Sequence, residues 1–144
     1  MPFKIELNEY GQIVRTPFNL SDSFYEGQIN GELDLLKSDG KVLAGCSVWT
    51  RKGTKVADIA WFSDELWKKQ KEKTEATMAP EICGEVSSKS NTDYEMNQKR
   101  KFYFEQGAKE FWFCDDYENM SFYSPKRKLK KSILFPEFPD RVEI

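Results

Sequence analysis

The sequence predicts an α/β (α+β) fold, with helices packed on a central mixed β-sheet, in a single domain over residues 1–144. Strand-like and helix-like hydrophobic patterns interleave along the chain, and turn or cap residues separate them. No linker, repeat or low-complexity tract interrupts this order. Hydrophobic residues make up 39% of the 144 residues, which is enough to build one core.

The expected elements start with a hairpin and end with two strands. They are a hairpin over 3–7 and 12–14, a helix over 22–37, strands over 41–49 and 55–62, a short helix capped by Ser63, a strand over 81–87, a helix over 92–106, and strands over 109–114 and 119–124. The tail that follows holds a basic run and then several prolines.

Local signals place the ends of these elements. Residues 8–11 (NEYG) suit the turn of the hairpin, and 51–53 (RKG) suit the turn between the next two strands. The first helix has apolar residues at helical spacing, with Ser21 or Asp22 as its cap. Residues 92–95 (TDYE) have the form of a capping box and begin the next long helix.

The composition removes several classes of chemistry. There is no histidine, which excludes Ser-His-Asp and Cys-His catalysis and histidine-ligated zinc. A metal site would therefore use mainly oxygen ligands, which favours magnesium, manganese or calcium. The formal net charge is -2, so nucleic acid would bind through a local patch rather than through the overall field.

The cysteines and the N-terminal segment indicate the compartment. Cys46, Cys83 and Cys114 are odd in number, far apart and close to apolar residues, which indicates buried thiols rather than a disulfide framework. No segment has the pattern of a signal peptide or a membrane span. We therefore expect a cytoplasmic protein that does not contact a membrane.

Two acidic residues interrupt strands that are otherwise apolar. Asp58 lies in the segment VADIAW, and Glu85 lies in ICGEV. A buried carboxylate costs several kcal/mol unless it is paired or binds a metal. A sheet-end acid facing solvent, or a structural ion pair, would explain either residue alone, but the two together favour a shared site.

Lys99 is the third candidate. It lies on the same face of the helix over 92–106 as Met96 and Tyr103, whereas Arg100 points the other way. An inward lysine has a carboxylate partner or a catalytic task, unless it only extends past the edge of the core.

Two carboxylates and a lysine at one point suit metal-assisted hydrolysis of a phosphodiester. The acids would hold one or two divalent cations, and the lysine would orient or deprotonate the attacking water. The leading hypothesis is a Mg2+- or Mn2+-dependent endonuclease acting on DNA. Two alternatives stay open. One is a non-catalytic module of the same fold that binds nucleic acid or another protein, and the other is a structural protein in which Lys99 only pairs with Glu85.

Several segments resemble the Uma-type family of restriction endonucleases, which has the PD-(D/E)xK nuclease fold. The central match comprises 80–88 (PEICGEVSS), 91–92 (NT), Lys99, Tyr103 and 107–112 (GAKEFW), and weaker matches are 5–7 (IEL), Pro17, 56–61 (VADIAW), 132–136 (SILFP) and 138–139 (FP). The resemblance covers nearly the whole chain. It implies a restriction-endonuclease-like three-layer core, in which a central mixed sheet is flanked by helices.

The resemblance also implies roles for individual residues. Asp58 and Glu85 would bind the metal ion. Ser87 stands where the wider fold has a lysine two positions after the glutamate. The family is similar in this respect and carries a lysine on the following helix, which matches Lys99. Lys89 is an alternative that ranks below Lys99.

Other residues are accessory candidates. Glu6 matches an N-terminal acid that could approach the metal, and Ser88 could fix the strand end or contact the site. Gln98 and Tyr103 are weaker candidates, and a tyrosine in this position more often packs in a core.

A basic run near the C-terminus could bind a phosphate backbone, although a charge run is usually just solvated surface. Its charged residues are Lys126, Arg127, Lys128, Lys130 and Lys131. Small nucleases often act as dimers so that both strands can be cut, and an exposed strand such as 119–124 could form a homodimer interface.

Overall fold

The computed structural model of the chain describes residues 3–87 and 92–142. Its strands are β1 (Phe3–Leu7), β2 (Ile13–Pro17), β3 (Lys41–Leu43), β4 (Cys46–Thr50), β5 (Gly53–Ala57), β6 (Ile59–Phe62), β7 (Ile82–Val86), β8 (Glu110–Cys114), β9 (Met120–Tyr123) and β10 (Lys128–Leu129). Its helices are α1 (Leu20–Leu36), α2 (Asp64–Gln70) and α3 (Asp93–Glu105).

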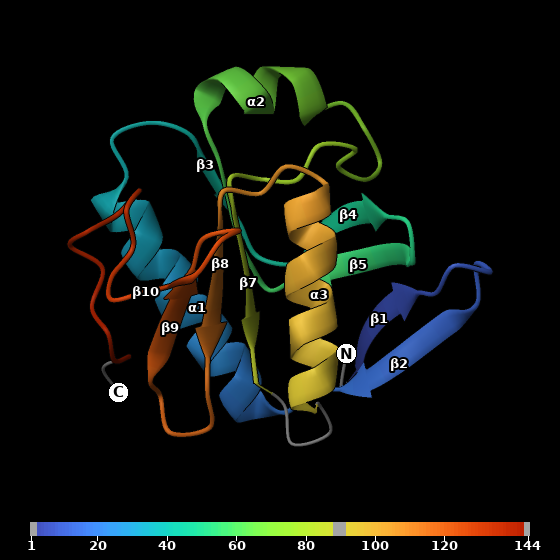
Figure 1. Cartoon of the computed structure of the whole chain (residues 1–144), viewed down its shortest axis with the longest axis horizontal. Helices are drawn as coiled ribbons and strands as arrows, with labels where there is room; N and C mark the ends of the chain where they lie inside the picture. Colours follow the sequence, from blue (N-terminus) through green and yellow to red (C-terminus); the bar gives the residue numbers. More distant parts are fainter. Residues whose placement is uncertain (1–2, 88–91, 143–144) are drawn as a thin grey trace.

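Six strands form the central sheet, in the order β10-β9-β8-β7-β6-β3. Strands β7 and β8 run parallel, whereas the other neighbours in the sheet run antiparallel. Helix α1 lies behind the sheet and α3 lies in front of it (Figure 1). This mixed sheet between two helical layers confirms the predicted fold class.

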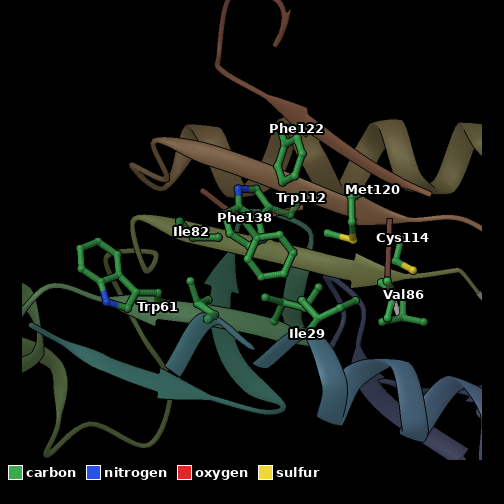
Figure 2. Close-up of a cluster of buried hydrophobic side chains, with 12 residues drawn as sticks. Ile29, Trp61, Ile82, Val86, Trp112, Cys114, Met120, Phe122 and Phe138 are labelled. Carbon is green, nitrogen blue, oxygen red and sulfur yellow. The ribbon is translucent and has the colours of Figure 1, made fainter. Parts of the chain in front are cut away.

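Each face of the sheet buries its own hydrophobic cluster, because successive residues of a strand point to opposite faces. On the α1 side, Ile82 and Trp112 pack with Phe138 of the C-terminal tail, whose ring centroid lies 4.6 Å from that of Trp112 (Figure 2). On the α3 side, Cys83 and Phe111 pack against the helix. Side chains on β7 therefore face α1 and α3 in turn.

The two long strands expected over 41–49 and 55–62 are each divided in two. Gly45, with a φ of 74°, lies in the break between β3 and β4, and Asp58 lies at a bend between β5 and β6. Strands β3 and β6 pair within the central sheet, whereas β4 and β5 form a separate two-stranded sheet. Asp58 is therefore placed at the joint between two sheets.

The N-terminal end of α1 differs from the prediction, while that of α3 agrees with it. Asn19 caps α1 by accepting a hydrogen bond from Asp22 N at 2.9 Å, and Asp22 Oδ2 accepts one from Asn19 N at 2.9 Å. The prediction that Ser21 or Asp22 is the cap was wrong, because Asp22 acts as the partner in the first turn. Thr92 caps α3 as predicted, by accepting from Glu95 N at 3.1 Å.

Strand β9 is covered on both sides, which changes the expectation for an interface strand. It pairs with β8 on one side and, through Phe122 and Tyr123, with β10 on the other. The residues of β10 come from the basic run that the sequence analysis left without regular structure. The expectation that 119–124 is an exposed strand was therefore wrong.

Cys46, Cys83 and Cys114 are buried and free of disulfide bonds, as predicted. Among the described residues, no helix is long and apolar enough to cross a membrane.

Candidate functional site

The two predicted acids lie together where β5, β6 and β7 meet. Asp58 is 3% exposed at the bend after β5, and Glu85 is 0% exposed on the side of β7 that faces α3. Asp58 Oδ2 accepts a hydrogen bond from Val86 N at 2.9 Å. The backbone of β7 thus holds Asp58 next to the acid of its own strand.

Gly84 allows β7 to lie close to its neighbours. A Cβ at this position would come 2.9 Å from Ile59 Cδ1 and 2.9 Å from the Trp112 carbonyl oxygen. A side chain here would push β7 away from β6 and β8, so the glycine helps to fix the position of Glu85.

Helix α3 brings Lys99 to the acids, as its helix phase predicted. Lys99 Nζ donates to Glu85 Oε1 at 2.9 Å and to Glu6 Oε2 at 2.8 Å. One turn further along α3, the Tyr103 hydroxyl donates to Glu85 Oε2 at 3.2 Å. Tyr103 is therefore both a core residue and a neighbour of the acids.

Lys4 is a member of this cluster that the sequence analysis missed. Its ammonium lies 2.9 Å from Asp58 Oδ1 and 2.7 Å from Glu85 Oε1, and its side chain is 8% exposed. It contacts both acids, whereas Lys99 contacts Glu85 and Glu6. The two acids predicted to bind a metal ion thus share one ammonium group in this structure.

The strand that carries Lys4 buries its polar side. Phe3 and Ile5 are exposed, while Glu6 is buried and Lys4 points into the cluster. Glu6 Oε2 also accepts from Val56 N at 2.7 Å, which docks β1 on the edge of β5 opposite β4. The alternation of Lys4 and Glu6 with apolar residues was the available sequence signal for this strand. It was misleading, because a half-buried strand normally buries its apolar side.

Burial and charge shift the pKa values of these groups in opposite directions. Burial and the charge of Glu85 raise the pKa of Asp58 to about 6, against the opposing effect of Lys4. Burial would also raise the pKa of Glu85, but the Lys4 and Lys99 ammonium groups outweigh it and lower that pKa. Burial would lower the pKa of Lys4, but the charges of Glu85, Asp58 and Glu6 raise it. The neighbouring charges therefore favour the ionised forms of Glu85 and Lys4, whereas burial favours the protonated form of Asp58.

Helix α1 adds an acid that the sequence analysis also missed. Glu26 is half-buried, and burial together with the charge of Asp58 raises its pKa to about 7. One turn later, Asn30 Nδ2 donates to the Asp58 carbonyl oxygen at 2.9 Å. This face of α1 therefore lies over the bend at Asp58.

The other candidates that the structure describes do not contact the two acids. Ser88 and Lys89 lie outside the described residues. Gln98 is half-buried on α3, and within the described ranges no hydrogen bond joins it to Asp58 or Glu85. The basic run lies on the other side of α3, where residues 126–128 line a groove.

A divalent cation needs several oxygen donors around it. Among residues 3–87 and 92–142, no group of three acidic or cysteine side chains converges as a ready metal site. Asp58 and Glu85 nevertheless place two carboxylate oxygens around the single ammonium of Lys4. Magnesium is usually bound through one or two carboxylates together with water and substrate oxygens. The two acids therefore fit a Mg2+ or Mn2+ ion that also contacts a substrate.

Comparison with known proteins gives the family. The family model Uma2, described as "Putative restriction endonuclease", matches residues 9–132. The chain belongs to the Uma2 family. The matched range includes Asp58, Glu85 and Lys99, whereas Lys4 and Glu6 precede it.

A solved structure supports the Uma2 fold. It is the crystal structure of a "putative nuclease belonging to DUF820" from Anabaena variabilis ATCC 29413, with a TM-score of 0.69. The identity is 15%, and the match covers 85% of this chain and 73% of that chain. At this identity the likeness shows a shared fold. No curated protein matches the chain.

Proposed function

We propose that the chain is a metal-dependent endonuclease that hydrolyses DNA phosphodiester bonds. In this proposal Asp58 and Glu85 bind Mg2+ or Mn2+, and Lys99 positions the nucleophilic water. The Uma2 match and the nuclease fold of the structural relative support a nuclease. One observation carries the assignment of the site. Both buried carboxylates contact the same positive group, the Lys4 ammonium, which occupies the position that we propose for the metal ion.

Hydrolysis joins a water oxygen to phosphorus and breaks the bond to one ester oxygen, which takes up a proton. A bound divalent ion supplies a Lewis acid that stabilises negative charge and lowers the pKa of water. The protein must hold the acids ionised, exclude bulk water and aim a donor at the reacting atoms. The Lys4 ammonium contacts both acids and, with Lys99, lowers the pKa of Glu85, which serves the first need. Burial of Asp58 and Glu85 serves the second need.

Lys99 is suited to the third task. An ammonium has three N–H donors, and Glu6 and Glu85 accept two of those of Lys99. The third can donate to water or to a phosphate oxygen. Both carboxylates fix the direction of the side chain, so a hydrogen bond to the transition state needs little reorganisation.

The test is nicking of supercoiled plasmid with Mg2+ or Mn2+. We expect Asp58→Asn, Glu85→Gln and Lys99→Met each to lower the rate about 100-fold or more, equal to about 3 kcal/mol of transition-state stabilisation. Matched controls are Glu65→Gln and Lys68→Met, which change exposed residues of α2 and should keep the wild-type rate. Equal nicking by wild type and all three site variants would show that the catalytic assignment is wrong.

A second candidate is a non-catalytic module of the same fold. The observation in its favour is that Lys4 and Lys99 already neutralise the buried acids. Calorimetric titration with Mn2+ separates the two candidates. Heat of binding that disappears in Glu85→Gln supports the enzyme, and no heat in any variant supports the module. If Lys99 is only structural, Lys99→Met keeps or raises the melting temperature and metal does not shift it.

A further inference from the structure

We propose that a basic groove between α3 and the turn joining β9 to β10 binds the phosphate backbone of a nucleic acid. The groove encloses about 680 Å³ and is lined from both elements. The proposal rests on the proposed nuclease function for the identity of its ligand, and it assigns that ligand a binding surface separate from the acidic cluster.

Five cationic side chains line this groove, and they come from two distant parts of the sequence. They are Arg100, Lys101, Lys126, Arg127 and Lys128. Within the described residues, none of the five forms an ion pair with a carboxylate, while the groove's own acid Glu105 pairs with Arg51 at 2.8 Å. Since the whole chain has a formal charge of -2, this positive charge is local. Unpaired cations around a hollow favour a polyanion with several charges in a row.

One cationic group and the turn that carries the others have defined contacts in the protein alone. The guanidinium of Arg100 lies 4.3 Å from the centroid of the Tyr123 ring. Ser124 N donates to Arg127 O at 2.8 Å, and Ser124 Oγ accepts from Arg127 N at 3.3 Å, which closes the turn. An ordered turn and a stacked guanidinium lose less conformational entropy on binding than free side chains do.

The groove lies on the opposite flank of α3 from the acidic cluster. Lys99 faces the acids, and the next residue, Arg100, lines the groove. A helix with its side chains is about 10 Å across. Duplex DNA carries one charge for each ~1.7 Å of its axis. About six phosphates therefore span α3, so one duplex lying across the helix can reach both the acids and the groove.

The structure also changes which basic residues matter. In the sequence, residues 126–131 form one basic run. Lys130 and Lys131 are exposed but do not line this groove, whereas Arg100 and Lys101, from α3, do. The concave shape favours a nucleic-acid strand over a flat lipid surface. The experiment below also distinguishes DNA from an acidic protein.

The experiment measures binding of a labelled short DNA duplex by fluorescence anisotropy in EDTA, between about 50 and 200 mM NaCl. The test variant is Lys126→Ala/Arg127→Ala. The matched control, Lys68→Ala/Lys69→Ala, removes the same charge from the exposed end of α2. Each lost phosphate contact lowers the slope of log K against log[salt] by about 0.9. We therefore expect a slope smaller by about 1.8 and roughly 60-fold weaker binding near 0.1 M salt for the test variant, and no change of slope for the control.

Equal effects of the two double variants would overturn the proposal, because only net charge would then matter. Absence of duplex binding by wild type, or tighter binding of polyglutamate than of DNA, would also overturn it. Because binding is measured in EDTA, the outcome is independent of catalysis. Binding that behaves as expected without Asp58-dependent nicking would refute the nuclease and leave the groove, and the reverse result would refute the groove alone.

Discussion

Replacing Lys4 with methionine removes the ammonium that lies 2.9 Å from Asp58 Oδ1 and 2.7 Å from Glu85 Oε1. Methionine keeps most of the side-chain volume, so the change tests charge rather than packing. Glu85 keeps its contact with Lys99 at 2.9 Å, but Asp58 loses its ammonium partner. Asp58, at the bend before β6, and Glu85, on β7, are then left buried with one ammonium, which lies between Glu85 and Glu6.

The expected loss of stability follows from the burial of the pair. Removing one partner of a buried ion pair costs about 3–5 kcal/mol. With an unfolding entropy of about 2.1 cal/mol/K per residue, a chain of this length loses about 3 °C of melting temperature for each kcal/mol. We therefore expect Lys4→Met to melt about 10–15 °C below wild type at pH 8. The loss shrinks below pH 6, because one of the crowded carboxyl groups then takes up a proton.

The same variant should bind a divalent cation more tightly. In wild type a metal ion must displace the Lys4 ammonium, whereas in Lys4→Met it replaces a missing partner. A difference of about 3 kcal/mol corresponds to roughly 100-fold in Kd. The melting temperature of Lys4→Met should accordingly rise more with Mn2+ than that of wild type.

Thermal melts with and without Mn2+, followed by circular dichroism, measure both effects. The matched control is Lys52→Met, which breaks the exposed ion pair between Lys52 and Glu9 at 2.9 Å. An exposed pair contributes at most about 1 kcal/mol, so the control should shift the melting temperature by no more than about 3 °C. A Lys4→Met protein that melts with the control, or an equal Mn2+ shift in Lys4→Met and wild type, would refute this reasoning.

Two further predictions concern acids outside the proposed metal pair. Buried Glu110 accepts hydrogen bonds from Ser132 Oγ at 2.6 Å and from the backbone of Ile133 and Leu134 at 2.9 Å. Glu110→Gln should therefore lower the free energy of unfolding by about 3 kcal/mol and expose the tail to limited proteolysis. Unchanged proteolysis would contradict this prediction. The raised folded-state pKa of Glu26, about 7, means that its contribution to stability is fully present below its unfolded value of 4.5 and is lost as pH rises toward 7. Urea unfolding of Glu26→Gln between pH 5 and 8 should therefore show a smaller decline with rising pH than wild type, and an identical decline would count against this effect.

The sequence was sufficient for the three helices, for most of the strands and for three members of the cluster. Asp58 and Glu85 stood out because each interrupts an apolar strand, and the interior of a sheet rarely accepts an unpartnered charge. Lys99 stood out because helix phase separates it from Arg100, and the structure places these two neighbours on opposite flanks of α3. Local periodicity decides such features, so they can be read without knowing the fold.

Lys4 and Glu26 were missed because their burial depends on contacts far along the chain. The pattern of β1 favours burying Phe3 and Ile5, but the strand turns its charged side toward residues more than 50 positions away. Local hydrophobicity fails at this strand because long-range ion pairs decide its orientation. Sequences tend to break local rules at functional or strained sites.

The broken strands could not be predicted for a different reason. Residues 55–62 have one continuous strand pattern, and only the pairing partners show that β5 and β6 belong to different sheets. The tail is a similar case. Phe138 completes the core beside Trp112, although the proline-rich segment around it has no strand or helix pattern.

Asp58 lies in neither sheet, yet its side chain ties the two sheets together at the acids. The chain leaves the central sheet at Gly45, forms the hairpin of β4 and β5, and returns to the central sheet at Asp58. Val86 N, in the central sheet, donates to Asp58 Oδ2 at 2.9 Å, and this bond holds Asp58 beside Glu85. At the tip of the hairpin, the backbone of Gly53 lies close to β1, since a Cβ on Gly53 would come 2.2 Å from Leu7 O. A side chain at position 53 would therefore displace β1, the strand that brings Lys4 and Glu6 into the acidic cluster from outside the central sheet.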